Sequence, residues 1–385
     1  MSESGNHHLQ SETSNSKSVT NSEVKSSEVK KSEVKSGEVQ SNKVKSSTVN
    51  SNVMPGSSMI SESAYDRTAQ YIWETEKLSK YFPVKKHFFD RTPHRVRALQ
   101  QVSLRQKPGE TLGIVGESGC GKSTFGRTLM GLYPKSEGRI WVTGKEITSP
   151  ADNAHVLKHI QMVFQDPYAS LNPRMTVRQI LSEPLTLHKE LSRAEAAERV
   201  EATLAQIGLT KAQGESYPHE FSGGQRQRIG IGRAIISEPQ CIICDEPISA
   251  LDVSIQVQII KLLQQLQAEK QIGYVFISHD LNMVRYMSQS MAVMYLGHVV
   301  EEGRTQDVYN NPQHPYTQAL IKLNAPLAAP MSIGPVLTGE VPSPLDEIKG
   351  CPFVGRCPEV QPVCREKMPD LKDTGAQRVA CWQRM

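Results

Sequence analysis

The chain has 385 residues, of which 38% are hydrophobic, and its formal net charge is only +4. This length allows more than one domain, and so small a charge argues neither for nor against nucleic acid, which we do not expect as a partner. The longest apolar runs, such as MAVMYL, are far shorter than the roughly 20 residues of a membrane-spanning helix. No apolar stretch follows the first basic residues, so we predict no signal peptide and an intracellular chain.

Residues 1–66 differ in composition from the remainder. Nothing aromatic precedes Tyr65 and no arginine precedes Arg67. A five-residue repeat places valine at Val19, Val24, Val29, Val34, Val39, Val44 and Val49. With a period of five, successive valines point to different sides of a helix or strand. The Ser, Lys and Glu residues between them bury too little apolar surface to offset the conformational entropy lost on folding. We predict a disordered low-complexity tail; a docking role for the repeat is the less favoured alternative.

The sequence TLGIVGESGCGKST, residues 111–124, predicts an apolar strand, a glycine-rich loop and a helix that begins near Lys122. The loop fits the phosphate-loop pattern, in which glycines let backbone N–H groups wrap an anion at the positive end of a helix. Lys122 would reach the β- and γ-phosphates, and the Ser123 hydroxyl would ligate Mg²⁺. The predicted phosphate-binding residues are Gly116, Glu117, Ser118, Gly119, Cys120, Gly121, Lys122, Ser123 and Thr124.

A second apolar strand, CIICDEP, ends in two acidic residues. Asp245 is placed to hold Mg²⁺ through water, as in other phosphate-loop enzymes. Glu246 is the better candidate for the general base on an attacking water. The alternative, a strand that merely ends in solvated acids, is less favoured beside a complete phosphate loop.

Further motifs resemble those of the ATP-binding-cassette (ABC) ATPases. FSGGQRQR resembles the family's Leu-Ser-Gly-Gly-Gln signature, with Phe221 in place of leucine, and VFQDP resembles its Q-loop. SALD resembles its D-loop, and FISHD its switch histidine. The motif residues so identified are Gln165, Ser222, Gly223, Gly224, Gln225, Asp252 and His279.

The resemblance implies an α/β phosphate-loop NTPase of ABC type, with a mixed, mainly parallel sheet over residues 67–320 and a helical subdomain near 168–235. It implies ATP and Mg²⁺ as cofactors and a head-to-tail dimer of this chain with itself or with a paralogous ATPase. Catalysis would involve Glu246, His279, Gln165 and Lys122, and Mg²⁺ would be held by Ser123, Gln165 and Asp245. Tyr81 would stack on adenine, with Phe82 as the rival.

Finer matches resemble one branch of this family. The chain has one cassette and no fused membrane span, and DPYASLNPRMTV, HPYTQAL and GEVPSPLD resemble the ATPase subunits of oligopeptide and dipeptide importers. That resemblance implies two membrane permeases, an extracellular peptide-binding protein, a peripheral place on the cytoplasmic face of the membrane, and a transmission surface at residues 166–175. Nickel or glutathione import is the alternative within the class, and a redox- or iron-responsive ATP-dependent regulator is the alternative outside it.

Four of the seven cysteines lie in a C-terminal extension at residues 321–385: Cys351, Cys357, Cys364 and Cys381. An intracellular chain disfavours structural disulfides, and four thiolates suit either Zn²⁺ or an iron–sulfur cluster. GCPFVGRCP resembles a segment that holds a [4Fe–4S] cluster in some importer ATPases, so we favour the cluster over Zn²⁺.

The remaining cysteines have other predicted environments. Cys241 and Cys244 fall on a predicted strand at an odd separation, so we expect them on opposite faces, in the core. Cys120, beside a helix N-terminus that lowers thiol pKa, is expected to be open to alkylation.

Overall fold

A computed structural model of the chain describes residues 70–84, 94–187, 191–249, 251–324 and 339–384. All of these belong to one compact unit, Glu62–Met385. The predicted tail at residues 1–66 lies outside the described residues, so its disorder and the role of its repeat stay predictions.

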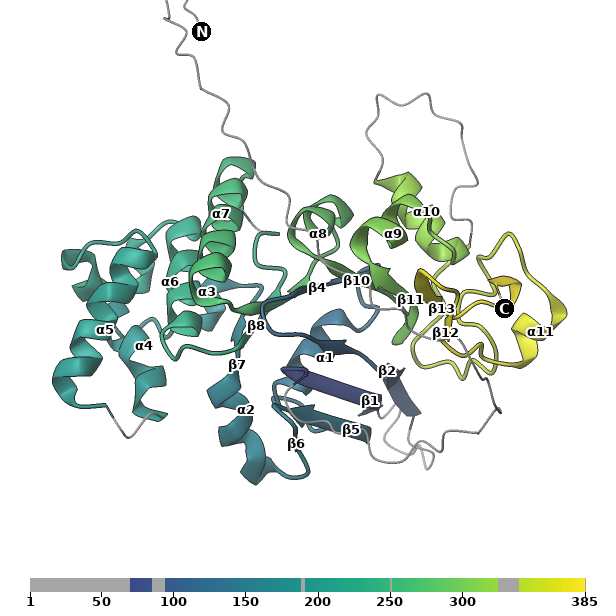
Figure 1. The fold of residues 1–385 in the computed structure, drawn as a ribbon, viewed down its shortest axis with the longest axis horizontal. Coiled ribbons are helices and arrows are strands. Elements are labelled where there is room, and N and C mark those ends of the chain that lie inside the picture. The colour runs from purple at the N-terminus through teal and green to yellow at the C-terminus, as the bar shows by residue number, and fades with distance from the viewer. Residues whose placement is uncertain (1–69, 85–93, 188–190, 250, 325–338, 385) are drawn as a thin grey trace, which may run out of the picture. The chain divides into compact units, whose positions relative to one another are not determined.

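The larger sheet has eight strands in the order β12-β13-β11-β10-β4-β9-β8-β7 (Figure 1). Strands β10, β4, β9, β8 and β7 run parallel, and β11, β13 and β12 continue the sheet with antiparallel pairings. The predicted α/β class with a mixed, mainly parallel sheet is therefore confirmed. The strands are β4 (Thr111–Val115), β7 (Ile160–Val163), β8 (Cys241–Asp245), β9 (Gly273–Ile277), β10 (Ser290–Tyr295), β11 (His298–Arg304), β12 (Lys372–Asp373) and β13 (Gln377–Val379).

The central strands are buried on both faces, which explains why they are continuous apolar runs rather than alternating ones. Every residue of β4, β8 and β9 is buried. Their side chains alternate between two apolar clusters, one on each face of the sheet. Cys241 belongs to one cluster and Cys244 to the other, so the prediction that they face opposite ways in the core is confirmed.

A smaller antiparallel sheet has the order β2-β1-β5-β6, with β3 paired to β1. Its strands are β1 (Trp73–Val84), β2 (His94–Val102), β3 (Arg105–Gln106), β5 (Glu137–Val142) and β6 (Lys145–Glu146). Helix α1 (Lys122–Leu129) packs between this sheet and the larger one, and Phe125 meets the Trp73 ring edge-on at 5.7 Å between centroids. The smaller sheet thus holds the helix that follows the glycine-rich loop.

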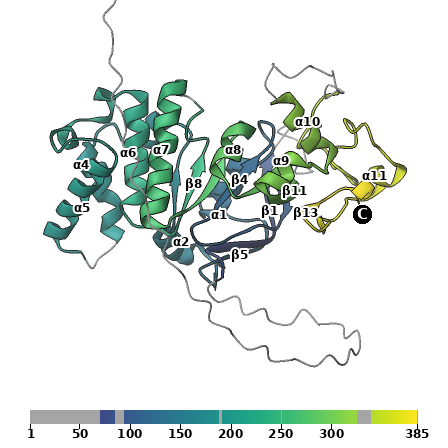
Figure 2. The same ribbon diagram turned by 45° about the horizontal axis from the view of Figure 1, so that its top comes forward.

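Helices gather beyond the β7 side of the larger sheet (Figures 1 and 2). They are α3 (Pro167–Ser170), α4 (Val177–Ser182), α5 (Arg193–Gln206) and α6 (Gly223–Ile235). Thr176 and Ser192 begin α4 and α5 with capping boxes, in which Gln179 and Glu195 bond back to the cap N–H groups. These helices fall within the span predicted as a helical subdomain, whose boundaries at 168–235 remain a prediction.

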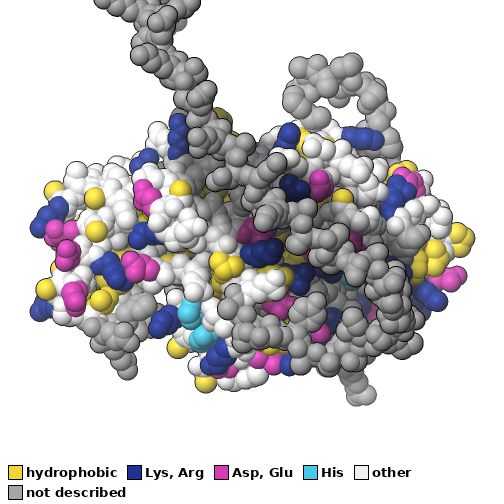
Figure 3. Space-filling view, in the orientation of Figure 1, with side chains coloured by type: hydrophobic (Ala, Val, Ile, Leu, Met, Phe, Trp, Pro, Cys, Tyr) yellow, Lys and Arg dark blue, Asp and Glu magenta, His cyan; other side chains and the backbone are white. Residues whose placement is uncertain are grey.

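The other helices cover the sheet or belong to the C-terminal region: α2 (Asn153–His159), α7 (Val253–Lys270), α8 (Leu281–Met287), α9 (Thr305–Asn310), α10 (Pro315–Leu323) and α11 (Pro362–Glu366). Among the described helices, none combines the length and apolar character that a bilayer-spanning segment needs. On the face drawn in Figure 3, Lys and Arg side chains are interspersed with Asp and Glu.

Candidate active site

Four strand ends bring the predicted site together. Parallel pairing sets Ile114 opposite Ile277, Asp245 opposite Ile277, and Val163 opposite Cys244. Strands β4, β9, β8 and β7 therefore end at one edge of the sheet, where ligands of open α/β sheets bind. The glycine-rich loop follows β4, and the segments with Gln165, Glu246 and His279 follow β7, β8 and β9.

The glycine-rich loop has a backbone that only glycine adopts without strain. Gly116, Gly119 and Gly121 have φ values of 151°, 80° and 107°. A Cβ at Gly121 would collide with the Ala98 carbonyl, and one at Gly116 with the Met294 carbonyl. Helix α1 begins at Lys122 as predicted, so its N-terminal amides face the loop. This cradle fits a phosphate group.

Lys122 lies inside the loop, with only 4% of its surface exposed. Its Nζ donates hydrogen bonds to the carbonyls of Gly116 at 2.8 Å and Glu117 at 3.0 Å. Among the residues that the structure describes, no carboxylate forms an ion pair with this buried ammonium, which suits it to an incoming phosphate.

Ser123 and Asp245, two of the predicted Mg²⁺ ligands, are joined directly. The Ser123 hydroxyl donates to Asp245 Oδ1 at 2.6 Å, and Asp245 is fully buried. Burial raises the pKa of Asp245, while the Ser123 bond and the nearby Arg127 oppose that rise. Arg127 Nη2 lies 3.5 Å from Oδ2, a contact that the sequence analysis missed. The oxygen pair fits a hard divalent cation.

Gln165 and His279 both contact the same carboxylate oxygen of Glu246. Gln165 Nε2 donates to Glu246 Oε2 at 2.9 Å, and His279 Nδ1 lies 3.4 Å from the same oxygen. Glu246 has a φ of 46°, a left-handed backbone that is strained for a non-glycine residue and typical of functional sites. Three residues predicted from separate motifs therefore form one cluster.

The signature residues begin α6. The Ser222 hydroxyl accepts the N–H of Gln225 at 3.3 Å, and the Gln225 side chain accepts the Ser222 N–H at 3.0 Å. A Cβ on Gly224 would press on Ile255 of α7 at 2.5 Å, so glycine lets the two helices approach closely. Gly223 is the first residue of α6. Asp252 occupies the N-cap position of α7 without a side-chain capping hydrogen bond, and Ala250 of the predicted D-loop lies outside the described residues.

Tyr81 lies on β1, where its hydroxyl donates to Glu137 at 3.2 Å. Phe82 instead packs edge-on against Tyr133 at 5.3 Å between ring centroids. A cavity of about 300 Å³ is lined by Tyr81, Pro83, Arg95, Ser136 and Glu137. Of the two rivals for adenine stacking, Tyr81 is the one that lines open space, and its role stays a prediction.

Cys120 is only 4% exposed, and burial raises the pKa of its thiol even though Lys122 acts in the opposite direction. The expectation of a reactive, low-pKa Cys120 was therefore wrong, because desolvation outweighs the helix N-terminus.

The four C-terminal cysteines, Cys351, Cys357, Cys364 and Cys381, line one small cavity of about 10 Å³. Burial raises the pKa of Cys351 to about 12, and neighbouring thiols contribute to that rise. No set of three or more Cys, His, Asp and Glu side chains in the described part of the chain stands at metal-ligating spacing. The prediction that these cysteines come together is supported, but a formed [4Fe–4S] or Zn²⁺ site is not.

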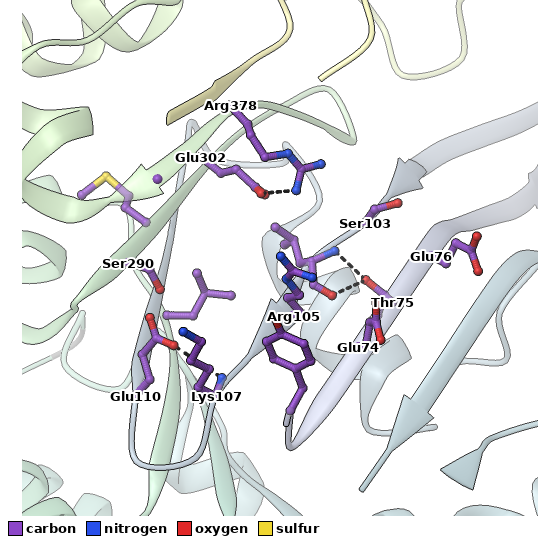
Figure 4. Close-up of a pocket in the computed structure, with 15 residues that line it drawn as sticks. Glu74, Thr75, Glu76, Ser103, Arg105, Lys107, Glu110, Ser290, Glu302 and Arg378 are labelled. Atoms are coloured by element: carbon purple, nitrogen blue, oxygen red, sulfur yellow. Dashed lines mark hydrogen bonds and ion pairs between the residues drawn. The ribbon is translucent and has the colours of Figure 1, made fainter. Parts of the chain in front are cut away.

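A separate cavity of about 460 Å³ lies between β1, β3 and the beginning of β4 (Figure 4). Seven of its 15 lining residues are charged, and Arg378 of β13 donates to its cross-strand neighbour Glu302 of β11 at 2.6 Å on one side of it. Glu110 and Leu112 line it, which places it at the opposite end of β4 from the phosphate loop. None of the predicted site residues is among those that line it, so this cavity is not the nucleotide site.

Comparisons with known proteins agree with this geometry. Residues 99–249 match the ABC transporter family, and residues 300–364 match the C-terminal region of oligopeptide/dipeptide transporters. The chain is 49% identical over 317 residues to the oligopeptide transport ATP-binding protein AppF of Bacillus subtilis, an alignment that covers 80% of this chain and 96% of AppF. It is 45% identical over 317 residues to the dipeptide transport ATP-binding protein DppF of Escherichia coli, with 81% and 94% covered.

Solved structures share the fold. CbiO1 of Clostridium perfringens, part of the ABC transporter complex cbiONQ, is similar with a TM-score of 0.54 at 30% identity, over 63% of this chain and 92% of that one. The cassette MJ0796, dimeric and bound to ADP and Pi, gives a TM-score of 0.54 at 26% identity, over 60% and 98%. The chain is therefore an ABC-type ATPase and belongs to the family of ATP-binding subunits of oligopeptide/dipeptide transporters.

Proposed function

We propose that the chain hydrolyses ATP to power the import of oligopeptides or dipeptides through two membrane permeases that receive cargo from an extracellular binding protein. It would work as a peripheral subunit on the cytoplasmic face of the membrane, in a dimer with itself or with a paralogous ATPase. The match of residues 300–364 to the oligopeptide/dipeptide transporter C-terminal region is the observation that carries this proposal. The names of the relatives AppF and DppF support it.

Bound Mg·ATP would supply the phosphoryl group to be transferred and a divalent charge beside it. In the proposed reaction, Glu246 takes a proton from the attacking water, while Gln165 and His279 hold its carboxylate. Lys122 and the amides of the glycine-rich loop would bind phosphate oxygens, and Ser123, Gln165 and Asp245 would hold the divalent ion. Ser222 and Gly224, at the positive end of α6, face the nucleotide of the partner cassette in the proposed dimer.

The segment at residues 166–175 is the proposed contact with the permeases. Asp166 caps the short helix α3, accepting the N–H groups of Tyr168 and Ala169 at 2.8 and 3.2 Å. Tyr168 is 62% exposed, with Arg226 against its ring. Tyr168 lies three residues after Gln165, so a permease that contacts this segment would be linked to the site through a short stretch of chain.

Uptake measurements test the cargo. In cells that lack this chain but keep its permeases, uptake of a labelled tripeptide is expected to be lost and to return with the wild-type chain, but not with Glu246→Gln. Uptake of nickel and of glutathione, measured in the same cells, is expected to be unchanged. Loss of nickel or glutathione uptake alone would assign the chain to a related importer. Normal uptake of all three would favour the ATP-dependent regulator.

We also propose that Cys351, Cys357, Cys364 and Cys381 take up a metal, as a [4Fe–4S] cluster or, alternatively, Zn²⁺. The support is that four thiols from separate parts of the extension line one cavity. That cavity is no larger than one water molecule needs, so a cluster would require the thiols to move apart. Burial raises the pKa values of the Cys351, Cys357 and Cys381 thiols, so a metal must displace protons there and metal uptake would weaken at low pH.

Metal analysis after anaerobic purification tests this proposal. We expect about four iron atoms and acid-labile sulfide per chain for the cluster, or about one zinc ion for the alternative. Cys357→Ser is expected to lose most of the metal, whereas Cys120→Ser, which changes a thiol outside the quartet, is expected to keep it. Only traces of iron and zinc in the wild-type chain would overturn the proposal.

A further inference from the structure

The C-terminal extension reaches directly into the phosphate loop through Arg356. Its guanidinium binds the Glu117 carboxylate with two parallel hydrogen bonds, Nη1 to Oε2 at 2.8 Å and Nη2 to Oε1 at 3.1 Å. The Arg356 side chain is only 7% exposed, and Glu117 is 25% exposed. A partly buried, two-pronged pair of this kind fixes geometry as well as charge.

Glu117 is also held at its backbone. Its N–H donates to the Tyr316 hydroxyl of α10 at 2.9 Å, and its carbonyl accepts from Lys122 at 3.0 Å. The carboxylate, the amide and the carbonyl of one loop residue are thus fixed by three different parts of the chain. The side chain of Glu117 consequently points to the extension, and the carbonyl to the phosphate-binding lysine.

Aromatic packing holds Arg356 in place. Phe353, three residues earlier, is fully buried and packs against Tyr295 and Tyr316 at 5.4 Å between ring centroids. Arg356 Nη1 also donates to the Tyr295 hydroxyl at 3.4 Å, and its N–H donates to the Phe353 carbonyl at 3.0 Å. The position of Arg356 therefore depends on the packing of the segment between Cys351 and Cys357.

We propose that Arg356 is a positioning residue for nucleotide binding: it neutralises the Glu117 carboxylate and draws it away from the phosphate cradle, so that the extension completes the ATP site. This inference rests on the proposed ATP binding at the glycine-rich loop and deepens it. A carboxylate on this loop would otherwise repel the phosphates of ATP at short range. Pairing with a buried guanidinium removes that repulsion.

Equilibrium titration with a fluorescent ATP analogue, mant-ATP with Mg²⁺, tests the role on the purified full-length chain. Arg356→Gln is expected to weaken binding roughly tenfold, because it leaves Glu117 charged and unpaired near the phosphates. The KM for ATP in hydrolysis should rise in parallel, with kcat at saturating ATP changed by less than about twofold. Arg356→Lys, which keeps the charge but loses the two-pronged contact, should fall between.

The second-site variant separates positioning from folding. Arg356→Gln combined with Glu117→Gln is expected to regain wild-type affinity, since no unpaired carboxylate remains. A merely structural arginine would predict the opposite, with the double variant no better than the single one. Arg384→Gln is the matched control, because it breaks the pair with Glu359 inside the extension, 2.9 Å long, without touching the loop. It should bind mant-ATP like the wild type.

Three results would overturn the inference: unchanged affinity in Arg356→Gln, no rescue by Glu117→Gln, or an equal loss in Arg384→Gln. Thermal unfolding of each variant guards against loss of fold. If Arg356→Gln does not fold, Arg356→Lys decides, since it keeps the charge beside Glu117 and must still bind mant-ATP more weakly than the wild type. Failure of the wild-type chain to bind mant-ATP would instead refute the proposed function, so the two failures are distinguishable.

Discussion

Glu246→Gln is expected to lower kcat for ATP hydrolysis by about 10³-fold, because the amide cannot take a proton from the attacking water. The substitution keeps the shape of the side chain, and its carbonyl oxygen still accepts the hydrogen bond from Gln165 that the structure gives at 2.9 Å. Nucleotide binding should therefore persist. Steady-state release of phosphate measures kcat, and mant-ATP titration measures affinity. We expect the variant to retain ATP and to accumulate as a closed dimer, which size-exclusion chromatography with light scattering would detect.

The matched control is Glu238→Gln, a surface carboxylate with 56% of its side chain exposed that pairs with Arg199 and Lys270. Exposed ion pairs of this kind contribute about 0–1 kcal/mol to the free energy of unfolding, so the Glu238→Gln variant should stay folded and its turnover should stay within twofold of the wild type. Glu246→Gln with more than a tenth of wild-type turnover would remove Glu246 as the base. His279, which lies 3.4 Å from the same oxygen, would then be the next candidate.

The central strands were predictable because a short, continuous apolar run is stable as a strand that is buried on both faces of a sheet. TLGIV and CIICD became β4 and β8, and both are fully buried. The motif residues were predictable for a related reason: parallel strands place their carboxyl ends at one edge. The convergence of Gln165, Glu246 and His279 follows from that topology. Their individual roles are still predictions.

Long-range contacts between residues that belong to no shared motif set could not be predicted. Arg356 and Glu117 are 239 residues apart, and Arg127 and Asp245 are 118 apart. No local period or motif spacing specifies such pairs, because they depend on how the extension and α1 pack. Cys120 illustrates the same limit for pKa. Its place beside a helix N-terminus is visible in the sequence, but its burial is a property of the tertiary structure, and burial dominates.

The second large effect is expected for Lys122→Met, which keeps an unbranched aliphatic stem in a side chain that is 4% exposed but removes its charged, hydrogen-bonding end. We expect affinity for mant-ATP to fall at least 100-fold, because the substitution removes a desolvated cation from the phosphate cradle. The carbonyls of Gly116 and Glu117 also lose their donor, which should lower the free energy of unfolding by about 1–3 kcal/mol. Peptide uptake in complemented cells should be abolished.

Stability and affinity must be separated, because a loosened loop would also bind nucleotide poorly. Lys145→Met is the surface control: it breaks the 2.7 Å pair with Asp152, half of its side chain is exposed, and both affinity and stability should stay near wild type.

Adding Glu117→Gln to Lys122→Met should not restore binding, since the missing group is a cation rather than an uncompensated acid. That response is the reverse of the rescue expected for Arg356→Gln. In our proposals the two basic residues act on the same loop in different ways: Lys122 binds phosphate directly, and Arg356 neutralises Glu117. A single pair of double variants therefore distinguishes the two proposed roles. A Lys122→Met chain that binds mant-ATP within threefold of the wild type would show that the loop holds phosphate by its amides alone.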